Sequence, residues 1–201
     1  KTAIQAVASA GPLLVLFAFT VPLTTLTSTA KALAAGPGSQ AWVLSAMSVG
    51  AAAGLLSSGA MGDDYGRRKV FVFGALILAL TSLMAALAPN GPVLVIARVL
   101  QGAGGAAILS CSLGLIGSVF EDGKAKANAT GVWAACLGAG VAIGPLLSAA
   151  LDHLGGWQMP YLVTAVAALG LGVAGHLVFS ESRAAQPRRI DVIGTLCLSG
   201  G

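Results

Sequence analysis

Six apolar segments follow one another along this chain, and each has the length that a helix needs to cross a lipid bilayer, about 20 residues. We predict helices over residues 4–28, 41–61, 70–88, 93–120, 127–151 and 158–179. Only 9% of the residues are charged, whereas a soluble domain has about a quarter. This is too little charge to cover a globular surface, so the composition predicts an all-α membrane protein.

The breaks between the apolar segments set the predicted domain organisation. Residues 1–180 are expected to form an N-terminal six-helix transmembrane bundle, residues 181–192 a cytoplasmic linker, and residues 193–201 the start of a truncated seventh helix. The first segment, with Lys1 before it and Ala32-Leu33-Ala34 after it, loosely resembles a signal peptide with its cleavage site. Its apolar stretch is longer than a usual signal-peptide core, which favours a membrane helix.

The basic residues are distributed unequally between the two ends of the predicted helices. Nine of the 11 lie on the side of the N-terminus, namely Lys1, Arg67, Arg68, Lys69, Lys124, Lys126, Arg183, Arg188 and Arg189. Because Lys and Arg are retained on the cytoplasmic side, we expect a multi-pass protein of the cell (cytoplasmic) membrane with its N-terminus in the cytoplasm. Basic residues confined to short loops argue against a nucleic-acid partner.

A charged segment that contains glycines joins the second and third predicted helices. It reads Gly59-Ala60-Met61-Gly62-Asp63-Asp64-Tyr65-Gly66-Arg67-Arg68-Lys69. The pattern Gly-x-x-x-Asp-x-x-Gly-Arg-Arg resembles the loop between helices 2 and 3 of major facilitator superfamily transporters, although the same residue types are common in ordinary cytoplasmic turns. The resemblance implies gating roles for Gly59, Asp63, Gly66, Arg67 and Arg68. Asp64 stands where the family often has Arg, and its negative charge could weaken docking of the loop.

The fourth predicted helix contains a basic residue within its apolar stretch. Arg98 lies about 9 Å along the helix from Pro92, at 1.5 Å per residue. An embedded arginine either faces a polar interior or extends its side chain to the outer headgroups. The neighbouring Gln101 and small residues such as Gly102 favour the interior. The pattern Arg-x-x-Gln-Gly resembles the helix 4 signature of the same superfamily and implies a transport role for Arg98, Gln101 and Gly102.

The fifth predicted helix combines glycines at four-residue spacing with a proline. Gly140 and Gly144 lie on one helix face, where they allow a second backbone to approach, and Pro145 removes a backbone hydrogen bond and bends the helix. This resembles the Gly-x-x-x-Gly-Pro-x-x-Gly-Gly signature of the superfamily's antiporters and exporters. Ser148 and Ala149 replace the last two glycines, and both are small enough to preserve close packing.

Taken in order, the three patterns identify the chain as resembling the N-terminal half of a major facilitator superfamily exporter. Gly155-Gly156-Trp157 is similar to the 14-helix drug:proton antiporters, although Gln158 stands where they usually have Arg; the 12-helix exporters are the close alternative. The resemblance implies secondary active export of small amphipathic organic compounds by alternating access, with protons, the lipid bilayer and the missing C-terminal half of the transporter as partners. It implies no enzymatic activity, catalytic residue, cofactor or metal. Export of a polar metabolite such as a sugar or amino acid, and a non-transporting receptor or assembly bundle, are the alternatives.

One departure from the family concerns coupling to protons. If Pro22 matches the proline of the antiporters' first helix, Leu13 takes the position of their Asp, and all seven acids of this chain lie in or beside predicted loops. This leaves three alternatives: coupling depends on the missing half, it depends on Arg98 acting indirectly, or there is no coupling. The first helix has a hydroxyl stripe at Thr20, Thr24 and Thr27, which either lines a substrate cavity or bonds its own helix's carbonyls. A small-residue ridge on the second helix, formed by Ala46, Gly50, Gly54, Ser58 and Gly62, predicts helix packing.

Overall fold

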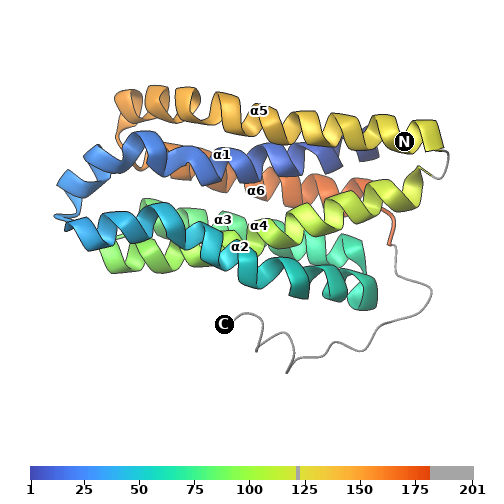
Figure 1. Cartoon of the computed structure of the whole chain (residues 1–201), viewed down its shortest axis with the longest axis horizontal. Helices are drawn as coiled ribbons and strands as arrows, with labels where there is room; N and C mark the ends of the chain where they lie inside the picture. Colours follow the sequence, from blue (N-terminus) through green and yellow to red (C-terminus); the bar gives the residue numbers. More distant parts are fainter. Residues whose placement is uncertain (121–122, 182–201) are drawn as a thin grey trace.

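The structure, a computed structural model, describes residues 1–120 and 123–181, and the regular elements in these residues are α-helices. In chain order they are α1 (Thr2–Ala32), α2 (Pro37–Tyr65), α3 (Arg67–Ala86), α4 (Gly91–Val119), α5 (Gly123–Gly155) and α6 (Met159–Val178). Their long axes run in roughly the same direction, and the N-terminus lies at the same end of the bundle as the start of α5 (Figure 1). The predicted linker after Glu181 and the predicted seventh helix at 193–201 lie outside the described residues.

The helices have the length and composition of membrane spans. Helices α1, α3, α4, α5 and α6 are each long and apolar enough to cross a bilayer. Helix α2 adds a sixth span when its two segments, Pro37–Leu55 and Ser57–Tyr65, which are bent by 43° relative to each other, are counted together. The all-α class and the six-helix bundle predicted from the sequence are therefore confirmed.

One difference from the predicted helix boundaries is at the charged segment between the second and third helices. Helix α2 continues to Tyr65 and α3 begins at Arg67, so most of this segment is helical. Gly66 alone makes the turn, with φ at 110°. Glycine adopts this conformation readily because it has no Cβ atom. The charged side chains of the motif therefore lie on helix ends, where their directions are fixed by the helices.

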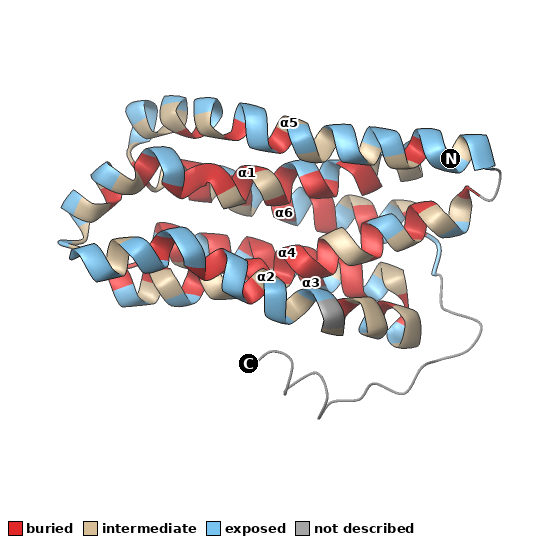
Figure 2. Cartoon of the chain, viewed as in Figure 1, coloured by how far each residue is buried: buried red, intermediate tan, exposed pale blue. Residues whose placement is uncertain are grey.

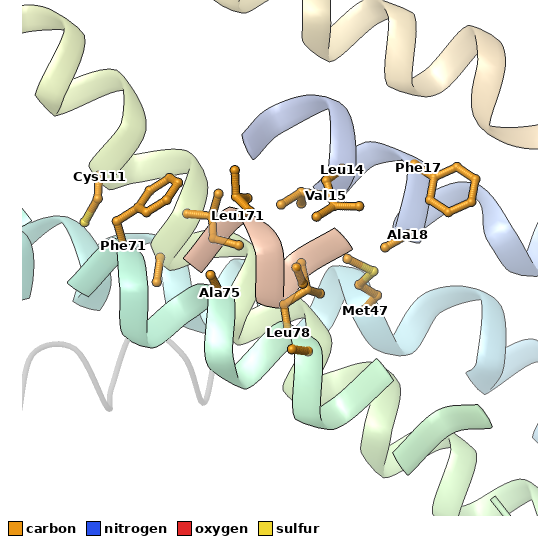
Figure 3. Close-up of a cluster of buried hydrophobic side chains, with 14 of the residues drawn as sticks. Leu14, Val15, Phe17, Ala18, Met47, Phe71, Ala75, Leu78, Cys111 and Leu171 are labelled. Carbon is orange, nitrogen blue, oxygen red and sulfur yellow. The ribbon is translucent and has the colours of Figure 1, made fainter. Parts of the chain in front are cut away.

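The apolar core lies between α1, α3, α4 and α6. Figure 3 shows part of it, where Leu14 and Val15 of α1 lie near Phe71 and Leu78 of α3 and near Leu171 of α6. Helix α4 packs against both α2 and α3, whereas α5 packs mainly against α1. In Figure 2 most of α5 is exposed; its buried residues are Ala129, Gly140, Gly144 and Ser148. Helix α4 is thus central, and α5 is attached to the bundle along one narrow face.

The small-residue ridge of α2 packs against α4. A Cβ atom added to Gly50 would overlap the carbonyl oxygen of Val99, and one added to Gly62 would lie 2.9 Å from the Cys111 sulfur. From the opposite side, a Cβ atom at Gly102 would overlap the Met47 carbonyl oxygen. The two backbones therefore touch directly, which is how membrane helices associate where lipid offers no hydrophobic driving force. The predicted packing role of this ridge is confirmed.

This contact predicts that one added methyl group separates the two helices. Gly50→Ala is expected to destabilise the bundle by about 1–3 kcal/mol, because the methyl group meets backbone that cannot move aside. Gly59→Ala is the matched control, since nothing in the described structure lies within 4 Å of its added Cβ and alanine is the better helix former. Thermal unfolding of the two variants in detergent measures the difference, and equal unfolding temperatures would contradict the contact.

Candidate functional site

Arg98 lies inside the bundle with no exposed surface. Its Nη1 donates hydrogen bonds to the carbonyl oxygen of Ala18 at 2.8 Å and to Oε1 of Gln101 at 2.9 Å, and its Nη2 donates to the carbonyl oxygen of Phe19 at 3.2 Å. The guanidinium group therefore faces α1, and the side chain does not extend to a headgroup layer. This is the interior position that the adjacent Gln101 and small residues favoured.

A proline in α1 explains why Arg98 finds acceptors on a helix backbone. Pro22 has no N–H group, so the carbonyl of Ala18, four residues earlier, has no partner in its own helix. A buried carbonyl left without a donor is costly, and the Nη1 group of Arg98 supplies the missing donor. Pro22 and Arg98 thus compensate each other: one frees a buried acceptor, and the other needs it.

The Arg98 contacts extend through Gln101 to α3. The Gln101 amide accepts from Arg98 and donates through Nε2 to the Ser82 hydroxyl at 2.8 Å, and both partners of this second bond are fully buried. The Nε atom of Arg98 and the hydroxyl of Tyr161 on α6 are also buried, and neither has a hydrogen-bond partner among the described residues. Neither Ser82 nor Tyr161 was singled out from the sequence, since neither stands in a spacing pattern that indicates a polar contact.

Helices α1 and α5 meet along a seam that advances one helical turn at a time on both helices. Gly140 lies over Leu16, Gly144 over Thr20, Ser148 beside Thr24 and Asp152 beside Ser28. At Gly140 an added Cβ would lie 2.6 Å from the Leu13 carbonyl oxygen, and at Gly144 it would overlap the Thr20 hydroxyl. Further along, the Thr24 and Ser148 hydroxyls are 2.6 Å apart, and Ser28 donates to Asp152 at 2.8 Å.

The hydroxyl stripe of α1 lies partly along this seam. The Thr20 hydroxyl donates to the carbonyls of Leu16 and Phe17 in its own helix, and Thr24 bonds across to Ser148. Thr24 therefore joins α1 to α5 through a hydrogen bond. Thr24 and Thr27 are exposed, and a substrate-contacting role for Thr20, Thr24 and Thr27 stays a prediction. Ser148, which replaces a glycine of the family signature, adds a hydrogen bond to a contact that glycine would make only by close packing.

The charged motif between α2 and α3 is anchored to α4. Arg67 forms an ion pair with Asp63 one turn earlier, donating from Nη2 at 2.8 Å and from Nε at 3.0 Å, and its Nη1 donates to the Gly114 carbonyl oxygen at 2.7 Å. Gly114 was not recognised from the sequence, yet a Cβ atom there would lie 2.8 Å from the Arg67 Nε atom. Arg68 points elsewhere, with Nη2 3.2 Å from Nδ1 of His176 on α6.

Comparison with known proteins identifies the family. A sequence model of the Major Facilitator Superfamily matches residues 8–195. The chain belongs to the Major Facilitator Superfamily. It is 36% identical over 154 residues to the multidrug efflux pump LfrA of Mycolicibacterium smegmatis, covering 77% of this chain and 31% of that protein.

Two Streptomyces proteins show the same relationship. The chain is 32% identical over 160 residues to the tetracenomycin C resistance and export protein of Streptomyces glaucescens, covering 79% of this chain and 30% of that protein. With the puromycin resistance protein pur8 of Streptomyces alboniger the identity is 33% over 192 residues, covering 96% of this chain and 38% of that protein. The chain thus spans about a third of the length of these superfamily relatives.

Within this superfamily chain the predicted residues form three separate clusters. Arg98 and Gln101 lie in the core, Asp63 and Arg67 lie at the turn between α2 and α3, and the α1–α5 seam contains Gly140, Gly144 and the half-buried Pro145. The first two clusters both contact α4 but at positions 98 and 114, about 24 Å apart along the helix at 1.5 Å per residue. Gly59 lies one turn before Asp63 on α2, and no described residue outside the neighbouring backbone of α2 lies within 4 Å of a Cβ atom added to it. The described residues hold no group of His, Cys, Asp and Glu side chains suited to a metal ion.

The pairing of Arg98 with the proline of α1 predicts a specific energetic coupling. Arg98→Ala leaves the Ala18 carbonyl without a donor, and Pro22→Ala restores an N–H group that competes with Arg98 for it. Arg98→Ala is therefore expected to destabilise the protein. The double variant is expected to be more stable than the sum of the two single changes by about 0.5–3 kcal/mol, because the restored N–H group supplies the donor that Arg98 no longer provides. Thermal unfolding of all four proteins measures this coupling.

The control for this cycle is Pro12, the other proline within α1. Pro12→Ala combined with Arg98→Ala is expected to give additive changes, because Arg98 makes no contact with the turn that Pro12 opens. Additive changes for Pro22 as well would show that Arg98 does not depend on the carbonyl that Pro22 frees.

Proposed function

We propose that this chain is the N-terminal six-helix part of a secondary active exporter that moves small amphipathic organic compounds, such as drugs or antibiotics, out of the cell in exchange for protons. The observation that carries the proposal is the similarity of most of the chain to proteins named as drug efflux, resistance and export proteins. Transport requires the rest of such an exporter, because superfamily members alternate access by moving two halves around a central site.

We place the N-terminal end of the bundle in the cytoplasm of a cell whose plasma membrane holds the exporter. The Lys1 ammonium lies 6.0 Å from the centre of the Phe120 ring at the end of α4, and Arg67 bonds to Gly114 near the same end. Lys124 and Lys126 begin α5 at this end as well. Basic residues therefore gather at one end of the helices, which supports a cytoplasmic position for it.

Arg98 is proposed to set the electrostatics of substrate or proton exchange. Within the described residues the only ion pair joins Arg67 to Asp63, so the charge of Arg98 is balanced by carbonyl dipoles and the Gln101 amide. A charge held this way is expensive and normally functional. It would favour the deprotonated form of an acid that approaches it, and we infer that such an acid is contributed by the part of the exporter outside this chain.

The other two clusters are proposed to control which side of the membrane is open. Asp63 is already bonded to Arg67, and its remaining acceptor capacity is proposed to hold the cytoplasmic side closed by accepting from a helix N-terminus or an arginine of the other half. Gly144 and Pro145 are proposed to limit leakage near the outer side, since the contact at Gly144 leaves no space between α1 and α5.

The proposed role of Arg98 predicts a graded loss of coupled export. In the complete exporter, Arg98→Ala is expected to abolish efflux driven by a proton gradient, since the interior charge is lost. Arg98→Lys is expected to restore only part of it, because an ammonium group lacks the planar fork that contacts Ala18, Phe19 and Gln101 together. Efflux of a fluorescent drug from everted membrane vesicles measures this, with insertion checked by membrane abundance. Full efflux by Arg98→Ala would refute the role.

The proposed role of Asp63 predicts a shift towards the inward-open state. Asp63→Asn is expected to lower efflux and to increase labelling of a cysteine introduced by Ser118→Cys, an exposed position near the cytoplasmic end of α4, by a reagent applied from the cytoplasm. Asp64→Asn removes the same charge from the adjacent residue, which forms no ion pair among the described residues. It is the matched control, and an equal effect from both variants would exclude a specific role for Asp63.

A further inference from the structure

A pocket with a basic rim lies between α3 and α6 at the proposed cytoplasmic end. It has a volume of about 340 Å3, and its rim is formed by Arg68, Lys69, His176 and Glu181. Arg68 and His176 approach each other across the two helices, with 3.2 Å between Nη2 and Nδ1. The motif's other arginine, Arg67, is occupied by Asp63 and Gly114 and does not line this pocket.

The charges on this rim are mainly positive, and within residues 1–120 and 123–181 its two permanent cations form no ion pair. The one acid in the lining, Glu181, lies against the backbone of Gly66, where its carboxylate would collide with a Cβ atom. It forms no ion pair with Arg68 or Lys69, because the ion pair of the described residues is that of Arg67 with Asp63. The lining therefore combines two permanent cations and the His176 imidazole with a single carboxylate, and the N–H groups of Arg68 and Lys69 are suited to bind an anion.

The inner wall of the pocket is apolar and continues into the part of the bundle that crosses the membrane. Val72, Phe73 and Leu76 of α3 line it below the rim, and Phe73 is 59% exposed. Further from the basic end, Leu80 on α3 and Val173 on α6 are also exposed, at 67% and 55%. A basic rim above an exposed apolar track matches a molecule with an anionic head and a hydrocarbon tail.

We propose that this pocket binds an anionic phospholipid of the cytoplasmic leaflet. Arg68, Lys69 and His176 contact its phosphate, and one acyl chain lies along Val72, Phe73 and Leu76. Basic pockets between membrane helices on the cytoplasmic side have the right charge and depth for such headgroups. The inference depends on the proposed orientation of the bundle. Arg68 lies in the first turn of α3, directly after the α2–α3 turn, and His176 lies near the end of α6. A lipid bound to both residues would therefore hold these two helix ends together.

The test measures lipid binding to the complete exporter by native mass spectrometry and by thermal unfolding in detergent with added phosphatidylglycerol. The double variant Arg68→Gln and Lys69→Gln is expected to weaken binding about 30-fold, from roughly fivefold for each basic residue at a membrane surface. The matched control is Lys124→Gln with Lys126→Gln, which removes the same charge from the same end of the bundle on α5. It is expected to bind phosphatidylglycerol as the unmodified protein does.

Three results would overturn the inference. An equal loss with the Lys124 and Lys126 control would show diffuse attraction in place of a site. Binding of phosphatidylcholine as strong as that of phosphatidylglycerol would show that the apolar track alone holds lipid. Saturation by inorganic phosphate, with no advantage for the lipid, would show a site for a free anion.

Two further measurements keep the test decisive. If the double variant unfolds, His176→Gln and Phe73→Ala remove the imidazole and the apolar wall separately, and each is expected to weaken binding by severalfold. Drug efflux is recorded in parallel. An exporter with no preference for anionic lipid at this pocket refutes this inference alone, whereas a protein that binds the lipid here but exports no drug refutes the proposed function alone.

Discussion

A guanidinium group inside a membrane bundle must find acceptors for its N–H groups, and the arrangement of α1, α3 and α4 follows from how Arg98 meets that need. No acid pairs with it among the described residues, so the acceptors are backbone carbonyls and an amide. Backbone carbonyls in a helix are normally occupied, and Pro22 is what makes one available at Ala18. Pro22 in α1 and Arg98 in α4 therefore act as one structural unit, whose position is fixed further by the bond from Gln101 to Ser82.

Helices α2 and α5 pack against their neighbours in the same way, through glycines and a serine at four-residue spacing. Gly50, Gly54 and Ser58 on α2 pack against α4, and Gly140, Gly144 and Ser148 on α5 pack against α1. In each case the serine bonds a hydroxyl on the facing helix, Ser58 with Ser110 at 3.0 Å and Ser148 with Thr24 at 2.6 Å. Helices α2 and α5 run in opposite directions, being the middle members of two successive groups of three helices. This is the inverted repeat expected within one half of a superfamily transporter.

Most of the helical organisation could be predicted from the sequence, because an apolar segment about 20 residues long has few alternatives in a membrane. The exact ends of the helices could not be predicted, since helices such as α5 continue through polar residues beyond the apolar segment. The interior position of Arg98 was indicated by Gln101 and the small residues beside it. The hydrogen-bond partners of Arg98 could not be predicted. Pro22 indicates that the carbonyl at position 18 lacks a helix donor, but which residue bonds to that carbonyl depends on how α1 and α4 pack. Gly114, Ser82 and Tyr161 were missed for the same reason.

The contacts of α4 also indicate where movement can occur. Arg98 ties one part of this helix to α1, and Arg67 ties position 114 to the turn between α2 and α3. Rotation of α4 about its axis would break both sets of hydrogen bonds. At Arg98 it would leave fully buried polar groups without partners, which costs far more in a membrane interior than in water. Along the α2–α4 and α1–α5 contacts the backbones already touch, so there is no space for a closer approach. The bundle is therefore expected to move as a rigid body. In the proposed exporter, the change of access then comes from motion of this bundle relative to the rest of the protein.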